Sequence, residues 1–373
     1  MTTDFLIVGA GVIGLTSAQA LLQAGYSVTL VERGAVGQEA SWAGGGILSP
    51  LCPWDYQESV TRLALRGMGM FDAATAALKD ATGIDTEYQR SGMLILPPFQ
   101  HELAAQWCAL HQVELRQVNP LPNPSPGVRR ALLPSHFGGE LAQGQFEGGC
   151  LLLPEVAQVR NPRLLQALRC HVEMLGGVIL EQREVQRFEI AGDRVVALHT
   201  TQGKLVADAY IIAAGAWSKT LLSDHALNMD IRPIRGQILL FKFDAPPFQH
   251  ILLKENLYFI PRRDGHVLVG STLEDVGFDK SITLAARDAL LQRIGEIFPG
   301  WRDREPVQHW SGFRPASPDN IPTIGRHPHL TNLYANSGHF RYGVTMSFAS
   351  AELLLNAIEG KPQAFSVAEY RWY

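Results

Sequence analysis

A glycine-rich turn near the amino terminus limits what this chain can fold into more than any other feature. The Gly-x-Gly-x-x-Gly motif at 9–14 follows a continuous apolar run at 4–8, which is typical of a strand buried on both faces. Small and apolar residues at 13–24 favour a helix, and a second apolar run at 28–31 ends at Glu32, 18 positions after the last glycine. Together these features predict a βαβ unit of a doubly wound, mostly parallel α/β sheet.

The same unit predicts a dinucleotide site. Gly9, Gly11 and Gly14 permit a tight turn and a close approach of the backbone, and the N-terminus of the helix presents about +0.5 charge to a pyrophosphate. The carboxylate of Glu32 can accept hydrogen bonds from ribose hydroxyls. The alternative is a chance turn in a parallel sheet, which the strand before the motif and Glu32 after it argue against.

The composition describes a globular protein with a small-molecule partner. At 373 residues the chain predicts two domains. Its 32 basic and 36 acidic side chains give a net charge of −4, so we expect neither nucleic acid nor an anionic membrane surface as a partner. The four cysteines, at 52, 108, 150 and 170, lack metal-ligand spacing, so we expect no metal site and a reducing, cytoplasmic location.

The uncharged stretch at 5–31 could be mistaken for a targeting segment. A secretory signal begins with positive charge, whereas the only early charge here is Asp4. A membrane span needs about 20 mostly apolar residues, and this stretch contains four glycines together with Gln19 and Gln23. We therefore predict neither a signal peptide nor a membrane span.

Strand and helix signals alternate along the rest of the chain. An apolar run at 209–214 ends in Gly215, which indicates that the chain returns there to the dinucleotide-binding domain. That domain is assigned 1–82, 151–222 and 310–373, and a second, antiparallel-sheet domain for the substrate is assigned 83–150 and 223–309. Helices are predicted at 58–82, between Asn161 and Gly176, at 283–298 and at 343–358, strands at 178–181, 185–190, 194–200, 204–207, 236–243, 257–262 and 266–272, and loops at 35–50 and 117–127.

Further motifs, spread in order over almost the whole chain, resemble the D-amino-acid oxidase family of FAD enzymes. Within that family they are most similar to the bacterial glycine oxidases of thiamine biosynthesis. The resemblance implies a glutathione-reductase-like FAD-binding domain, interrupted in sequence by the substrate domain. Besides the amino-terminal turn, the motifs are the glycine-rich loop at 43–48 and the segments 211–218, 235–237, 258–262, 312–315 and 338–343.

The resemblance also implies where FAD lies. Because the related sarcosine oxidases attach flavin through a carboxy-terminal cysteine, and no cysteine follows Cys170, we expect FAD to bind noncovalently. A helix that begins near Gly343 would direct its N–H groups toward an anionic reduced flavin, although a simple strand-to-helix turn remains an alternative. The implied contacts are Glu32 and Arg33 with the adenosine, Val185 with the adenine edge through its backbone, Val12, Ile13, Ala40 and Ser41 with the pyrophosphate, and Gly45, Gly46, Ile47, His339, Phe340, Arg341, Tyr342, Gly343, Val344 and Thr345 with the isoalloxazine.

The predicted substrate site needs a carboxylate anchor and an amine site in front of the flavin. Arg314 can bind a carboxylate with two parallel hydrogen bonds, and Tyr258 can add a hydroxyl donor. By resemblance, the main-chain carbonyl of Arg341 receives the amino group, close to Ser49. The alternatives are a surface role for Arg314 and a core role for Tyr258.

Three pocket residues depart from the glycine oxidase pattern, which leaves the size of the pocket open. They are Ile47, Ser49 and Asn256. His339 could be read as a general base, but we expect a cofactor or backbone contact, since hydride transfer from a neutral amine needs no positioned base.

The resemblance implies oxidative deamination of glycine, with sarcosine and small D-amino acids as further substrates. Dioxygen would reoxidise the flavin to give hydrogen peroxide, and the imine would give glyoxylate and ammonia or enter thiazole synthesis. The alternatives are a sarcosine or N-methyl amino-acid oxidase, a quinone-linked D-amino-acid dehydrogenase, and a flavin-binding module without turnover. Since tetramers occur among the resembled oxidases, a homo-oligomer is expected.

Overall fold

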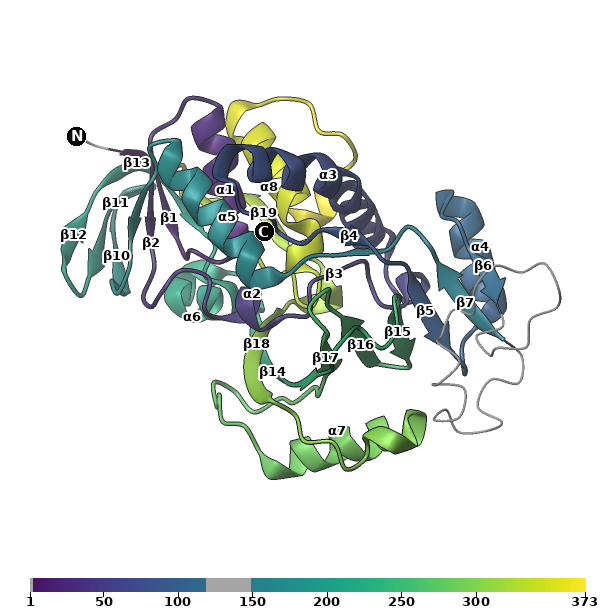
Figure 1. Cartoon of the computed structure of the whole chain (residues 1–373). Helices are drawn as coiled ribbons and strands as arrows, with labels where there is room; N and C mark the ends of the chain where they lie inside the picture. Colours follow the sequence, from purple (N-terminus) through teal and green to yellow (C-terminus); the bar gives the residue numbers. More distant parts are fainter. Residues whose placement is uncertain (1–2, 119–148) are drawn as a thin grey trace.

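The computed structural model describes residues 3–118 and 149–373 and places them in two main sheets (Figure 1). The first is a six-stranded sheet in the order β19-β20-β13-β1-β2-β9, parallel except for β19 at its edge. Three separate parts of the chain supply its strands, so the predicted fold class, with an interrupted dinucleotide-binding domain, is confirmed. The strands are β1 (Thr3–Val8), β2 (Val28–Val31), β9 (Val178–Leu180), β13 (Ala207–Ile212), β19 (Thr323–Arg326) and β20 (Leu333–Ser337).

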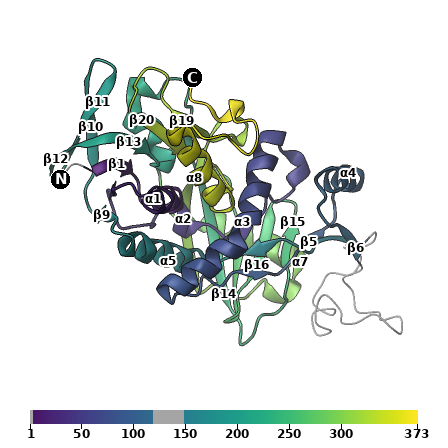
Figure 2. The ribbon, with the colours of Figure 1, turned by 90° about the horizontal axis from the view of Figure 1, so that it is seen from above.

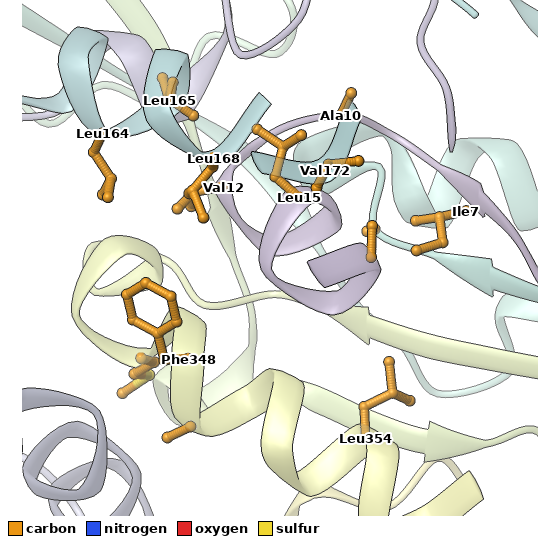
Figure 3. Packing of buried hydrophobic residues seen from close by; sticks show 14 of the residues in the cluster. Ile7, Ala10, Val12, Leu15, Leu164, Leu165, Leu168, Val172, Phe348 and Leu354 are labelled. Atoms are coloured by element: carbon orange, nitrogen blue, oxygen red, sulfur yellow. The ribbon is translucent and has the colours of Figure 1, made fainter. Parts of the chain in front are cut away.

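Helices cover one face of this sheet, with α1 (Val12–Gln23) between α5 (Asn161–Met174) and α8 (Gly343–Glu359), as Figures 2 and 3 show. Leu15 of α1 is fully buried in the same apolar cluster as Leu168 of α5. The long helix α3 (Glu58–Thr82) packs beside α8 and extends this core. Each buried side chain of this size contributes roughly 1.5–3 kcal/mol, so the layer holds the amino-terminal turn firmly.

The second main sheet has eight strands in the order β18-β14-β17-β16-β15-β5-β7-β6, and all its pairings are antiparallel except that of β5 with β15. Helix α7 (Leu284–Ile297) covers one face over an aromatic core that includes Phe259, Phe298 and Trp301. Helix α4 (His101–His111) packs on the other face through Ala104. The strands are β5 (Met93–Leu96), β6 (Arg116–Val118), β7 (Cys150–Leu153), β14 (Arg232–Lys242), β15 (Ile251–Lys254), β16 (Leu257–Pro261), β17 (His266–Gly270) and β18 (Gln308–Ala316).

Two small sheets and several short helices complete the fold. The sheet β10-β11-β12 packs on the far side of the parallel sheet, and the sheet β3-β8-β4 lies between the two main sheets. The bounds are β3 (Ile47–Leu48), β4 (Gln89–Arg90), β8 (Ala157–Gln158), β10 (Val185–Ala191), β11 (Arg194–Thr200), β12 (Gly203–Leu205), α2 (Ala40–Ala43) and α6 (Ser218–Leu222). The 3₁₀ turns are η1 (Pro53–Asp55), η2 (Gly215–Trp217), η3 (Ser223–Ala226), η4 (Pro299–Trp301), η5 (Pro318–Asn320) and η6 (Ala368–Tyr370).

The predicted helices are observed as α3, α5, α7 and α8, and the predicted strands as β9–β14, β16 and β17, with shifts at their ends. The elements that were not predicted are the helices α2, α4 and α6 and the strands β3–β8, β15 and β18–β20. Helix α2 and strand β3 lie within 35–50, so the prediction of a loop over that whole segment is wrong there. Most of the predicted loop at 117–127 lies outside the described residues. The predicted domain boundaries near 150 and 309 lie beside strands β7 and β18, which both belong to the eight-stranded sheet. The domain bounds remain a prediction. Within the described ranges, no helix is long and apolar enough to cross a membrane.

Candidate functional site

A cavity of about 580 Å³ lies between the two main sheets, where the carboxyl ends of β1 and β13 face β14 and β18. Nearly all of the residues predicted for cofactor and substrate line it. Gly14 and Thr345 do not: Gly14 packs beneath the amino-terminal turn, and the hydroxyl of Thr345 donates to the carbonyl of Ile47 at 3.1 Å. The lining residues include Gly9, Gly11, Val12, Ile13, Glu32, Arg33, Ala40, Ser41, Gly45, Gly46, Ile47, Ser49, Val185, Asn256, Tyr258, Arg314, His339, Phe340, Arg341, Tyr342, Gly343 and Val344.

The amino-terminal turn leaves no room for side chains at Gly9 and Gly14. A Cβ atom on Gly14 would lie 1.9 Å from the carbonyl oxygen of Gly9, and Gly9 itself has φ +104°. Helix α1 begins here without a side-chain N-cap, while the hydroxyl of Ser41 accepts a hydrogen bond from the N–H of Val12 at 2.9 Å. The positive end of α1 therefore faces the cavity, which suits a pyrophosphate.

Glu32 and Arg33 follow β2 at the edge of the cavity. One carboxylate oxygen of Glu32 accepts the N–H of Ala10 at 2.9 Å and the other accepts the N–H of Gly34 at 3.0 Å. Since each oxygen has a further lone pair, the carboxylate is fixed in place and can still accept ribose hydroxyls. The guanidinium of Arg33 stacks over the ring of Trp217, with 3.6 Å from Cζ to the centroid. These residues fit an adenosine.

The loop after α2 and the start of α8 form another wall of the cavity. A Cβ atom on Gly45 would lie 2.4 Å from Ile260, and Gly46 has φ +74° with the carbonyl of Val159 only 2.2 Å from where its Cβ would be. Helix α8 begins after Tyr342 without a side-chain cap. Among the described residues, the buried amide oxygen of Asn336, which also lines the cavity, has no hydrogen-bond partner. A wall of close-fitting backbone with open polar atoms fits a flat polar ring such as isoalloxazine.

His339 is buried and neutral. Its Nε2 lies 3.1 Å from the hydroxyl oxygen of Ser350. Because that hydroxyl already donates its hydrogen to the carbonyl of Met346 at 2.6 Å, Nε2 is the protonated ring nitrogen and donates the hydrogen bond to Ser350. Burial lowers the pKa of His339 to about 3. Such a group does not take up a proton near neutral pH, which agrees with the expectation that His339 is not a general base.

Arg314 lies on β18 with its guanidinium in the cavity wall. It donates to the carbonyl of Thr272 at 3.2 Å and to the hydroxyl of Ser271. Burial lowers the pKa of Arg314 from its usual value, and the neighbouring Tyr258 works in the opposite direction. An arginine stays cationic under such a shift, so the cavity holds a desolvated positive charge next to the largely buried ring of Tyr258.

The predicted carboxylate anchor, Arg314, adjoins the segment predicted to contact the flavin. The N–H of Phe340 donates to the carbonyl of Pro315 at 2.9 Å, one residue after Arg314. The next residue, Arg341, has a buried Nε for which the described residues offer no hydrogen-bond partner, and its guanidinium lies 5.3 Å from the ring of Phe340. The strand that carries the predicted substrate cation and the backbone predicted to bind the cofactor are thus joined by a main-chain hydrogen bond.

The three residues that depart from the glycine oxidase pattern have different surroundings. Ser49 is buried and its hydroxyl donates to the carbonyl of Pro50 at 2.8 Å. Asn256 is exposed and accepts a hydrogen bond from Arg293 of α7 at 2.8 Å. Ile47 lies in β3. Ser49 and Ile47 therefore lie within the wall, whereas Asn256 stands at its rim.

Sequence reasoning missed several residues that contact and support the residues of the wall. Ser271 and Thr272 hold the guanidinium of Arg314, and they carried no motif in the sequence. Tyr56 was also missed; its hydroxyl accepts a hydrogen bond from Tyr342, whose pKa burial raises well above its usual value. Trp217 was quoted within a motif, but its contact with Arg33 was not predicted.

Neither a metal cluster nor a cysteine lies in the wall. In residues 3–118 and 149–373, no group of three or more His, Cys, Asp or Glu side chains could hold a metal ion. All four cysteines are free thiols, and the cavity lining includes none of them.

The chain is similar over almost its whole length to known FAD enzymes. The model of the DAO family, described as FAD dependent oxidoreductase, matches residues 4–357. The glycine oxidase of Pseudomonas aeruginosa is 40% identical over 371 residues, which cover 99% of this chain and 98% of that protein. The glycine oxidase of Pseudomonas putida is 35% identical, with 99% and 98% covered. The crystal structure of glycine oxidase from Geobacillus kaustophilus matches with a TM-score of 0.89 at 26% identity, covering 100% of this chain and 98% of that chain.

Proposed function

The chain belongs to the family of FAD-dependent oxidoreductases, and from that premise we propose that it oxidises the amine of glycine. It is an FAD-dependent amine oxidoreductase. One observation carries the choice of an amino-acid substrate: the buried cation Arg314 lies beside Tyr258 in the same cavity as the dinucleotide turn. The two glycine oxidases that resemble almost the whole chain support glycine as the substrate.

In the proposed complex, the residues of this chain bind and orient a small zwitterion. The guanidinium of Arg314 takes the carboxylate with charge-assisted hydrogen bonds, and the hydroxyl of Tyr258 adds a donor. The amino group lies near Ser49 and the carbonyl of Arg341. When bound, FAD supplies the hydride acceptor for the Cα hydrogen and a path for the electrons to dioxygen. Fixing the substrate in this way supplies much of the rate enhancement, because the reacting atoms are aligned in advance.

Proton transfer is not assigned to His339. Its buried, hydrogen-bonded ring with a pKa of about 3 supports the proposal that the substrate reacts as a neutral amine without a histidine base. The product imine gives glyoxylate and ammonia on hydrolysis, or is handed on to thiazole formation in thiamine biosynthesis. Sarcosine and small D-amino acids are proposed as further substrates, and hydrogen peroxide as the second product.

The test is the visible spectrum of the purified protein, recorded without oxygen before and after glycine is added. We expect a flavin spectrum that glycine bleaches, and oxygen consumption when air is admitted. Arg314→Ala protein should keep its flavin but need far more glycine. Bleaching by sarcosine and not glycine would favour an N-methyl amino-acid oxidase, and reduction of a quinone or dye without oxygen uptake would favour a dehydrogenase.

The cellular setting belongs to the same proposal. Four cysteines that form no disulfide suit a reducing cytoplasm. The proposed homo-oligomer, a tetramer among its candidates, is checked by light scattering of the flavin-loaded protein, where a mass of one chain, 41.0 kDa, would contradict it.

A further inference from the structure

Strand β14 presents two different faces at Arg235, Gly236 and Gln237. Side chains alternate along a strand, so Arg235 and Gln237 lie on one face and Gly236 on the other. On its face, Gly236 makes space for the guanidinium of Arg314, whose Nη1 and Nη2 would both be 2.2 Å from a Cβ atom there. The two neighbours of Gly236 point away from the cavity.

On that outer face, Arg235 and Gln237 converge on one carboxylate, that of Glu274. Arg235 donates to Oε2 at 2.6 Å and Gln237 donates to Oε1 at 2.9 Å. The backbones of Arg235 and Glu274 also exchange two hydrogen bonds of 2.9 Å each. The side chains of Arg235 and Gln237 are 4% and 0% exposed, so Glu274 is the partner of a buried cation and a buried amide.

Glu274 is linked in turn to the segment that holds Arg314. The hydroxyl of Thr272 donates to Oε1 of Glu274 and accepts the N–H of Gln237 at 2.9 Å. The carbonyl of Thr272 accepts a hydrogen bond from the guanidinium of Arg314 at 3.2 Å, and the neighbouring hydroxyl of Ser271 accepts a second. Only Thr272 separates the carboxylate from the guanidinium.

We propose that Glu274 is a positioning residue for the substrate carboxylate: it orients Thr272, and Thr272 orients Arg314. This inference rests on the proposed role of Arg314 in glycine oxidation. Three donors, from Arg235, Gln237 and Thr272, converge on the carboxylate. An amide in its place would turn an NH₂ group either toward Arg235 or toward Gln237 and Thr272, so the network that holds Thr272 would lose at least one of its hydrogen bonds.

The experiment compares Glu274→Gln with Asp279→Asn in the FAD-loaded enzyme. Asp279 is the matched control, because it is the other carboxylate bound to Arg235, at 2.9 Å, and does not contact Thr272. We expect Glu274→Gln to raise the KM for glycine and the Kd for acetate, a carboxylate without an amine, about tenfold, which is about 1.4 kcal/mol. The kcat should change less than about twofold, because a displaced anchor weakens ground-state and transition-state binding alike. Asp279→Asn should leave all three constants unchanged.

A second pair tests the link if Glu274→Gln fails to fold. Thr272→Val removes the hydroxyl and should raise KM and the acetate Kd in the same way, whereas Thr272→Ser keeps the hydroxyl and should restore both. Equal constants in the Glu274 and Asp279 variants, or in both Thr272 variants, would overturn the inference and leave the proposed function standing. Unchanged acetate binding by Arg314→Ala would instead remove the proposed role of Arg314 itself.

Discussion

The guanidinium of Arg314 occupies the space that a side chain at Gly236 would need. A Cβ atom on Gly236 would lie 2.2 Å from both terminal nitrogens of Arg314, far inside van der Waals contact. In the antiparallel pairing of β14 with β18, Arg314 stands opposite Ile234, and Gly236 stands opposite Gly312. The side chain of Arg314 therefore reaches along the neighbouring strand and lies over Gly236. The position of the proposed carboxylate anchor therefore depends on a residue with no side chain.

Gly236→Ala should therefore displace Arg314. Forcing extra volume into a packed site typically costs about 1–3 kcal/mol, so we expect about a fivefold or larger rise in the KM for glycine, with FAD content retained. The measurement is steady-state oxygen uptake together with the flavin-to-protein absorbance ratio. Gly69→Ala is the control, because Gly69 is exposed in α3 and a Cβ atom there meets nothing within 4 Å. A variant at Gly236 with wild-type KM would contradict the spatial argument.

Arg314→Ala tests the anchor directly. Loss of a charge-assisted contact should cost about 1.5–3 kcal/mol, which corresponds to about tenfold or more in kcat/KM for glycine. Arg314→Lys keeps a charge but loses the paired donors, so we expect it to fall between alanine and wild type. Unchanged glycine kinetics in the alanine variant would reject the role of Arg314.

The parts of the fold that could be predicted have local signals. The turn at 9–14 could be predicted because a strand, three glycines and a helix follow one another within about twenty residues. Strand β18 has no such signal: Gln308–Ala316 contains a glycine and a proline, and its strand conformation comes from pairing with β14, far away in sequence.

The residues of the candidate site also fall into those with a local sequence signal and those without one. The cofactor residues were predicted because short motifs resemble a known family, and all of them except Gly14 and Thr345 line one cavity. The supports of Arg314 could not be inferred, since Ser271 and Thr272 follow β17, which is joined to β18 only through β14. The contact between Tyr56 and Tyr342 joins residues 286 positions apart, so no local pattern encodes it.

Gly14→Ala should impair both cofactor binding and stability. Its Cβ atom would lie 1.9 Å from the carbonyl oxygen of Gly9, so either α1 or the turn must move. We expect a protein that purifies with little flavin and melts at a lower temperature than wild type. Gly69→Ala is again the control and should stabilise its helix by about 0.5–1 kcal/mol. Full flavin content in the Gly14 variant would show that the turn does not need this glycine.

The flavin should leave the protein on denaturation. None of the four cysteines lines the cavity, so the lining offers no thiol for a covalent link. Acid precipitation should release the yellow colour into the supernatant, and a mass spectrum of the denatured chain should match the sequence mass of 41.0 kDa. Flavin that stays with the precipitate, together with a matching gain in mass, would establish a covalent link through another residue.

His339 should make the protein less stable as the pH falls. Burial lowers its pKa from 6.5 to about 3, so between these values the unfolded chain binds a proton that the folded chain does not. The free energy of unfolding therefore decreases on acidification through that window, by up to about 1.4 kcal/mol per pH unit from this group. His339→Asn removes the titrating ring, so denaturant unfolding at a series of pH values from about 6.5 to 4.5 should give a shallower slope than wild type. Since a direct loss of cofactor contacts would lower stability equally at each pH, the slope rather than the absolute stability is the test. Parallel slopes would mean that His339 is protonated within the folded protein, and a base role would have to be considered again.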